Sequence, residues 1–309
     1  MPAPSHSTLD LAGWSSALAS TLSFSIAAPI GTVLINLGLD PTTILVLRFW
    51  LATALLFGTL GLTAPGRLRL PRSGLLAVLA AGPAIGLGVL LYFWGLTRLH
   101  TSIAAMLIAL EPLVTLLLLA LRGERFTYRN TLRVALGLLG VYLLVGLQGS
   151  VDGLGVLMLL GTVLLSSFHT VALQWFLTEH DGRAVMAYVV LSMALTSSVF
   201  WLFLRPAWQP LSWQAWLGVG VLAFVCTYIA RLTLFAGVKR LGGGQVALLA
   251  PVETFLTIIW SVLFLGDRLT LAQAAGGVLI LLSAVLAVRR LGRAKVPQPD
   301  ETAEVIASP

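Results

Sequence analysis

The sequence predicts an all-α integral membrane protein with ten transmembrane helices in two inverted five-helix repeats. Three observations lead to this prediction. Of the 309 residues, 58% are hydrophobic and 10% are charged, whereas a soluble domain has about 45–50% apolar and about 25% charged residues. The apolar residues gather in runs close to the length of about 20 residues that a helix needs to span a bilayer. In addition, the second half of the chain repeats features of the first.

Ten apolar runs, each bounded by charged residues, Pro or Gly, are the predicted spans. They cover approximately residues 11–35, 42–62, 74–97, 101–121, 130–147, 154–177, 184–204, 214–237, 243–265 and 271–288. The predicted repeats are 11–147 and 154–288. Residues 1–10 lack the basic segment that begins a secretory signal, so they are interpreted as a cytoplasmic N-terminal segment before a retained span. Residues 289–309 begin basic and end polar, which predicts a cytoplasmic tail with a disordered end.

The distribution of Lys and Arg predicts the orientation of the helices. If the N-terminus is cytoplasmic, 14 of the 19 basic residues lie in cytoplasmic segments and three in outer loops, while Arg48 and Arg231 lie within spans. Basic residues concentrate in the cytoplasmic loops of membrane proteins, so both termini are predicted to be cytoplasmic. The net charge of +7 therefore indicates orientation and gives no reason to expect a nucleic-acid partner.

An internal repeat relates the two halves. A shift of 142 residues aligns Arg98 with Arg240 and Glu111 with Glu253. After a one-residue slip, GERFT at 123–127 aligns with GDRLT at 266–270. Because each repeat has an odd number of spans, the second copy inserts upside down relative to the first. Oppositely inserted halves are typical of secondary transporters, whose sites lie near the bilayer midplane.

Three sets of motifs carry a family resemblance. They are Arg48-Phe49, then Leu110-Glu111-Pro112 followed by 123–127, and Ala250-Pro251-Val252-Glu253 followed by 266–270. With the ten repeated spans, they make nearly the whole chain resemble the EamA family of the drug/metabolite transporter superfamily. The resemblance implies a multi-pass carrier of the cell inner membrane for small metabolites, often an exporter, with a cavity between the halves. Asp267 departs from the usual Glu but keeps the charge.

Two acidic residues are the first candidates for the site. Glu111 and Glu253 lie about ten residues into their spans, hence about 15 Å deep, near the midplane. An ionised carboxylate there is costly, so such residues face a cavity or a partner. The functional interpretation is a site for a substrate ammonium group or a proton. The alternative is that each Glu hydrogen-bonds a neighbouring helix.

Prolines follow or precede these acids. Pro112 and Pro251 lack a backbone donor and crowd the preceding turn, so they are predicted to kink their helices. The freed carbonyl groups could form part of the site or serve as a gate. Alternatively, they reflect only the higher frequency of Pro in membrane helices.

Three basic residues lie within spans. Arg48 could bind a substrate carboxylate, pair with Glu111 or Glu253, or be a structural anchor. Arg231 lies near the cytoplasmic end of its span and is expected to snorkel to the interface, although its position on one helical face with Tyr228 leaves a cavity role open. His169 could be protonated or bind a ligand, or it could hold two helices together.

Aromatic residues complete the candidate set. Tyr92 and Trp94 end the third span, Tyr228 shares a face with Arg231, and Trp260 lies two turns beyond Glu253. Such side chains would suit a cavity that binds planar or apolar solutes. For aromatic residues of membrane proteins as a group, anchoring at the interface is the stronger expectation.

Three function classes follow from these residues. The first is a secondary transporter that exports small organic solutes, such as amino acids or related metabolites, by alternating access. The second is an intramembrane enzyme and the third a channel-like membrane protein, both using the same midplane acids. No metal-ligand spacing, phosphate-binding loop, nucleophile elbow or ATP-binding motif occurs in the sequence, so no catalytic residue, metal or cofactor is predicted. The expected partners are a small-molecule substrate and membrane lipid.

Overall fold

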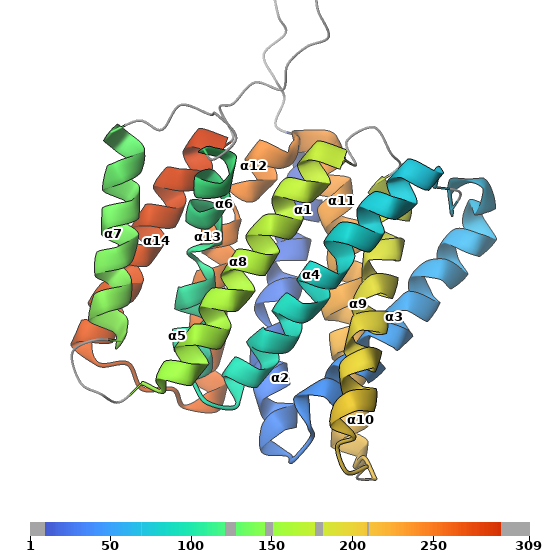
Figure 1. The fold of residues 1–309 in the computed structure, drawn as a ribbon, viewed down its shortest axis with the longest axis horizontal. Coiled ribbons are helices and arrows are strands. Elements are labelled where there is room, and N and C mark those ends of the chain that lie inside the picture. Colours follow the sequence, from blue (N-terminus) through green and yellow to red (C-terminus); the bar gives the residue numbers. More distant parts are fainter. Residues whose placement is uncertain are drawn as a thin grey trace, which may run out of the picture.

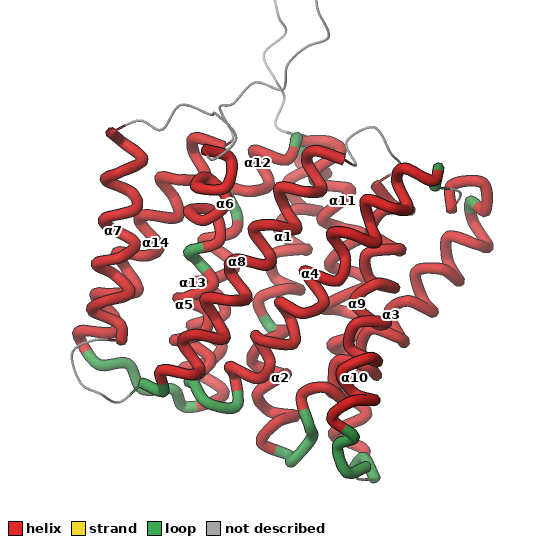
Figure 2. The backbone as a smooth tube through the Cα atoms, viewed as in Figure 1, coloured by secondary structure: helices red, strands yellow, loops and turns green. Residues whose placement is uncertain are grey.

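A computed structural model describes residues 10–68, 70–120, 128–145, 151–176, 182–208 and 210–291 of the chain. Throughout this described part every regular element is a helix (Figure 1). Loops join helices at the two ends of a bundle, and short turns at Ile26, 109–110 and 248–249 interrupt spans inside it (Figure 2). The predicted all-α class is therefore confirmed. The repeated segment 123–127, residues 1–9 and the tail from residue 292 lie outside the described residues.

The helices of the first half include two spans that are each built from two helices. In order, the helices are α1 (Leu11–Ser25), α2 (Ala27–Asn36), α3 (Pro41–Thr63), α4 (Arg72–Leu96), α5 (Thr101–Ile108), α6 (Glu111–Ala120) and α7 (Tyr128–Val145). A short 3₁₀ helix, Pro65–Leu68, follows α3. The helices α1 and α2 form one apolar segment, Leu11–Asn36, and α5 and α6 form another, Thr101–Ala120.

The second half has interrupted spans as well, and two of them contain π-helical segments. Its α-helices are α8 (Gly153–Phe176), α9 (Gly182–Leu204), α10 (Trp213–Ala223), α11 (Ala230–Leu241), α12 (Gly243–Ala247), α13 (Ala250–Trp260) and α14 (Leu271–Leu291). One π-helix, Phe224–Ile229, joins α10 to α11, and another, Ser261–Leu265, continues α13.

The lengths of the apolar helices agree with most of the predicted spans. Among the described residues, eight helical segments are long and apolar enough to cross a membrane. The predicted spans 130–147 and 271–288 correspond to shorter apolar helices, Thr131–Leu144 and Leu271–Ala287. These belong to α7 and α14, which lie side by side at one edge of the bundle (Figure 1). The two helices approach closely because a Cβ at Gly276 would lie 2.6 Å from the carbonyl oxygen of Gly140.

Local sequence explains several helix boundaries. Before α3, the Asp40 side chain accepts hydrogen bonds from the backbone N–H groups of Thr42 and Thr43 at 2.8 and 3.2 Å, as an N-cap does. At the start of α14, the backbone N–H of Gln273 donates to Thr270 Oγ1 at 3.2 Å, and the Thr270 N–H donates to Gln273 Oε1 at 3.0 Å. This reciprocal pair is a capping box. Gly242 ends α11 at φ +83°, which glycine adopts without strain.

The core of the bundle is divided into two clusters. One is centred on Phe49 of α3, Phe93 of α4 and Met193 of α9. The other is centred on Leu107 of α5 and Leu159 of α8. Side chains of the first cluster and of the helices around the second line a central cavity. The cavity therefore borders both parts of the core.

Candidate functional site

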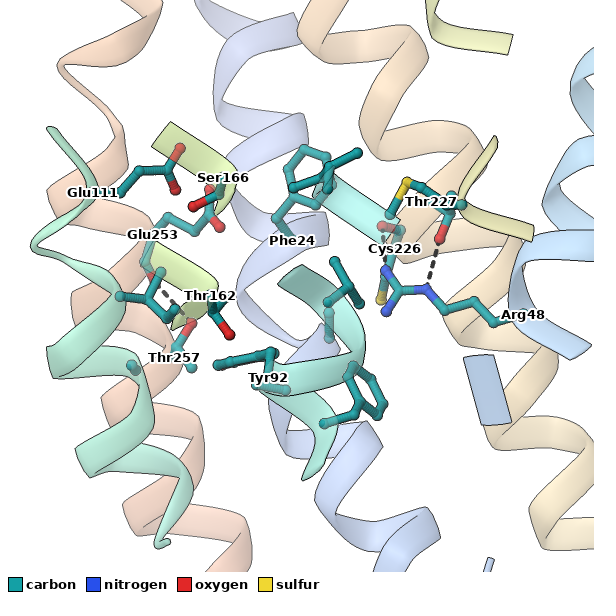
Figure 3. A pocket seen from close by; sticks show the side chains of 18 of the residues that line it. Phe24, Arg48, Tyr92, Glu111, Thr162, Ser166, Cys226, Thr227, Glu253 and Thr257 are labelled. Carbon is teal, nitrogen blue, oxygen red and sulfur yellow. Dashed lines mark hydrogen bonds between the residues drawn. The ribbon is translucent and has the colours of Figure 1, made fainter. Parts of the chain in front are cut away.

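A cavity of about 230 Å³ lies inside the bundle and receives side chains from both halves of the chain. Glu111 and Ser166 lie at one end with Glu253, while Arg48 and Thr227 lie at the other (Figure 3). Phe24 and Tyr92 occupy the space between the two ends (Figure 3). The cavity therefore has an acidic end, a basic end and an aromatic middle.

The acidic end is built where two spans are interrupted. A two-residue turn, 109–110, separates α5 from α6, which begins at Glu111, and the turn 248–249 separates α12 from α13. Pro112 and Pro251 are each the second residue of the new helix, a position where the missing N–H breaks no helical hydrogen bond. The predicted kinks coincide with these short turns, which place each glutamate in a first helical turn, where the helix dipole favours negative charge.

Glu111 is held by α8. Thr170 Oγ1 donates to Glu111 Oε1 at 3.2 Å, and Ser167 Oγ donates to the Glu111 carbonyl oxygen at 3.0 Å. Hydroxyl groups of membrane helices commonly bridge neighbouring helices in this way. The carboxyl group of Glu111 therefore borders the cavity while one of its oxygens is engaged by the protein.

Glu253 borders the cavity with a free carboxyl group. Its backbone carbonyl oxygen accepts a hydrogen bond from Thr257 Oγ1 at 3.0 Å, and the same hydroxyl lies 3.0 Å from the carbonyl oxygen of Ser25. Across the described residues, no group hydrogen-bonds the side-chain oxygens of Glu253. Its two carboxyl oxygens are thus available to a ligand.

Arg48 is held by the π-helix between α10 and α11. Its Nε donates to Thr227 Oγ1 at 2.8 Å, and its Nη2 donates to the Cys226 carbonyl oxygen at 3.3 Å. The guanidinium also lies 5.2 Å from the ring centroid of Phe49 and 5.9 Å from that of Phe93. A π-helix breaks the regular backbone hydrogen-bond pattern and is frequent at functional sites. Of the three interpretations offered for Arg48, an ion pair with a glutamate is wrong in this structure, since the described contacts contain none.

Arg231 also lines the cavity. Its Nη2 lies 3.6 Å from Met193 Sδ, and its Nε is buried with no hydrogen-bond partner among the described residues. The expected snorkelling to the interface is therefore wrong. The guanidinium stays inside the bundle because Arg231 is the second residue of α11, directly after the π-helix, and does not belong to the last turn of that helix.

His169 has a structural contact. Its side chain is 6% exposed, and Nδ1 lies 3.0 Å from the carbonyl oxygen of Ala81 on α4. The residue is absent from the cavity lining. The hydrogen bond connects α8 to α4, as expected from the interpretation that His169 holds two helices together.

Three of the four aromatic candidates pack away from the cavity. Trp94 makes an edge contact with Phe200 on α9, with ring centroids 5.9 Å apart. Tyr228 stacks on Phe224 at 5.7 Å. Trp260 Nε1 donates to Ser25 Oγ at 3.1 Å. Tyr92 is the aromatic candidate that lines the cavity.

Hydroxyl-bearing residues of the cavity were missed by the sequence analysis. They are Thr162, Ser166, Thr227, Thr254 and Thr257. Helical spacing could have found two of them, because Thr227 lies four residues before Arg231 and Thr257 four residues after Glu253, and such pairs share a helix face. No cluster of three or more His, Cys, Asp or Glu side chains suited to a metal ion occurs in the described ranges.

Apolar helices that could span a bilayer, with a cavity between them that contains charged and hydroxyl-bearing side chains, define a multi-pass integral membrane protein with an internal site for a small solute. Comparison with known proteins agrees with this class. The model of the EamA-like transporter family matches residues 11–146 and again residues 153–289. The chain belongs to this family, and the two matches correspond to the two repeats.

Individual relatives are distant. An uncharacterized transporter from Archaeoglobus fulgidus is 25% identical over 199 residues, which cover 64% of this chain and 71% of that protein. A crystal structure described only as that of a protein aligns with a TM-score of 0.63 at 23% identity, covering 90% of this chain and 98% of the other. This second likeness concerns the fold alone. Family membership and the first relative point to a membrane transporter with a small-molecule substrate rather than to an enzyme.

Proposed function

We propose that this protein is a secondary transporter that exports amino acids or related small organic solutes by alternating access. The observation that carries the proposal is the opposite charge of the two ends of the cavity (Figure 3). An amino acid presents an ammonium group that Glu253 and Glu111 would attract and a carboxylate that the arginines would attract. The cavity volume of about 230 Å³ suits a small solute.

The proposal includes ten spans in two inverted repeats, an inner (plasma) membrane location and two cytoplasmic termini. Support comes from the start of α1 and the end of α14, which lie at the same end of the bundle (Figure 1), and from the excess of Lys and Arg in the segments assigned to the cytoplasm. Cysteines introduced at 67–72 should resist impermeant thiol reagents applied to intact cells, whereas cysteines at 36–41 and 206–213 should react. Labelling of 67–72 from outside would overturn this orientation. Cys226→Ser provides the background.

Alternating access is supported by the interrupted spans. Breaks beside Glu111 and Glu253 allow the half-helices to move separately around a central site. If Pro112 and Pro251 act as gates, Pro112→Ala and Pro251→Ala should slow exchange more than they weaken binding. An equal loss of both would place the prolines in the binding site itself.

The proposed function is tested by counterflow in proteoliposomes with a panel of labelled amino acids. We expect saturable flux of unmodified solute that is accelerated by unlabelled amino acid on the opposite face. Flux that does not saturate would indicate a channel, and recovery of a chemically altered solute would indicate an enzyme. Absence of transport for the whole panel would overturn the proposed substrate class.

A further inference from the structure

The two arginines of the cavity differ in how they are held. Arg48 donates from Nε and from Nη2 to oxygen atoms of Thr227 and Cys226. The contact of Arg231 is a sulfur atom, Met193 Sδ at 3.6 Å, and its Nε is buried without an acceptor in the described structure. Thioether sulfur is a weak acceptor. The donors of Arg231 are therefore largely unused.

An unpaired guanidinium inside a membrane bundle is costly unless another group replaces the acceptors that it loses on leaving bulk water. A second cation nearby adds to this cost. Arg48 is held by Thr227 on the span that carries Arg231, and both arginines line the same cavity. Neither has an ion pair with Glu111 or Glu253. This end of the cavity thus has excess positive charge that a bound anion would neutralise.

The π-helix explains the direction of Arg231. Each residue turns an α-helix by about 100°, so one inserted residue rotates every later side chain by about that angle. The π-helical segment ends at Ile229, and Thr227 Oγ1 donates to the Leu222 carbonyl oxygen five residues earlier, at 2.9 Å. The same segment therefore supplies the groups that fix Arg48 and sets the direction in which Arg231 points.

We propose that Arg231 is the residue that binds the carboxylate of the transported solute, and that Arg48 is a positioning residue that holds the π-helix beside it. The inference rests on the proposed function and makes it more specific. The planar guanidinium can bind a carboxylate through two parallel hydrogen bonds. Solutes that retain the carboxylate are accepted, and amines without one are rejected.

The first test compares leucine with leucinamide and 3-methylbutylamine in proteoliposomes. The wild-type protein should prefer leucine, and Arg231→Gln should raise the KM for leucine by about tenfold or more, as expected when a charged hydrogen-bonded contact is lost. The same variant should change the KM for leucinamide and 3-methylbutylamine, which lack a carboxylate, by no more than about twofold. The preference for leucine over these two amines is then lost. Arg231→Lys should recover part of it. Arg240→Gln, on the same helix, serves as the matched control and should keep the preference.

Equal losses of leucine and amine transport in Arg231→Gln, or an unchanged preference, would overturn the inference. Arg48→Gln should instead reduce transport of all three compounds alike. A selective loss for leucine in Arg48→Gln alone would assign the carboxylate to Arg48.

The second test is independent of transport. Leucine and N-acetylleucine, which both carry a carboxylate, should raise the unfolding temperature of the detergent-solubilised wild-type protein, and leucinamide should not. Arg231→Gln should abolish both shifts. Without ligand, Arg231→Gln should unfold at or above the wild-type temperature, because it removes an unpaired buried charge. If neither carboxylate compound stabilises the wild-type protein, the inference about Arg231 is wrong. If leucine stabilises the protein but is not transported, the carboxylate site is supported and the proposed transport of leucine is rejected.

Discussion

The two repeats place similar charged residues around one cavity but treat them differently. Arg48 and Glu111, from the first repeat, are hydrogen-bonded by the second repeat through Thr227 and Thr170. Arg231 and Glu253, from the second repeat, line the same cavity, and no oxygen or nitrogen group among the described residues binds their side-chain polar atoms. Each end of the cavity therefore combines one fixed charge with one free charge.

The difference arises from the helices that face each residue. The π-helix and α8 present hydroxyl and carbonyl groups to Arg48 and Glu111. Around Glu253, the polar groups of Ser25 are already used, since its carbonyl accepts from Thr257 and its hydroxyl accepts from Trp260. The glutamates, which are equivalent in the repeat, thus differ in their contacts: Glu111 is hydrogen-bonded by α8, and the carboxyl group of Glu253 has no such partner among the described residues.

The largest expected effect separates the two glutamates. Glu253→Gln should lower kcat/KM for an amino acid by about 10–100-fold, the range for loss of a charged hydrogen bond. Glu111→Gln should lower it by less than about threefold, because the amide oxygen can still accept from Thr170. Counterflow by the purified variants measures both values.

Size-exclusion profiles show whether both glutamine variants remain folded. The pH profile of transport adds a second readout. If Glu253 carries a proton, the rate of transport depends on pH in the wild-type protein, and this dependence should be lost in Glu253→Gln. Equal loss of activity in the two variants would contradict the assignment of separate roles.

The second effect concerns the fixed arginine. Arg48→Lys replaces a planar group that makes two hydrogen bonds with a single point charge. The loss should cost about 1–3 kcal/mol and lower the unfolding temperature by about 2–6 °C. Arg231→Lys is the matched control and should leave the temperature near that of the wild-type protein. Similar decreases in both variants would show that Arg231 has a structural partner in solution.

The smallest effect concerns a surface contact between the first repeat and the segment that connects the two repeats. Arg98 lies 2.9 Å from Asp152, the residue before α8, and both side chains are exposed. The N–H of Gly155 and the neighbouring Arg98 lower the pKa of the Asp152 carboxyl below its usual value. Its contribution to stability is therefore present above about pH 4, the ordinary Asp pKa, and is lost as pH falls through the lower folded pKa.

Asp152→Asn should change the unfolding temperature by no more than about 2 °C at neutral pH, since exposed ion pairs contribute little. The difference between variant and wild type should disappear at acid pH. A thermal unfolding series across acid pH measures it. If the difference in unfolding temperature grew on acidification, the ionised Asp152 carboxylate could not be its cause.

The sequence was most informative about features that depend on local pattern. Hydropathy located the segments that became the long apolar helices, and the repeat predicted the two family matches. Glu111 and Glu253 were found because a carboxylate in an apolar run is conspicuous without any knowledge of its neighbours. The interruptions near Pro112 and Pro251 agree with the missing backbone donor of proline, but Pro83 lies within the continuous helix α4, so a proline alone does not decide where a helix is interrupted.

Other candidates depended on which helices meet. His169, Trp94 and Trp260 resemble cavity residues in the sequence, but each contacts a helix distant along the chain. Arg231 was assigned to the interface by its distance from the end of its span. The π-helix that changes its direction has no clear signature in an apolar run.

The sequence by itself determined the membrane class and the internal repeat and predicted the depth of the two acids, because apolar length, self-similarity and helical rise are properties of neighbouring residues. Only the tertiary structure decided which charges are held and which are free. Hydroxyl groups such as Thr227 and Thr170 meet Arg48 and Glu111 across gaps of 179 and 59 residues. Lateral packing between apolar helices has no strong sequence code, since nearly every face of such a helix is apolar.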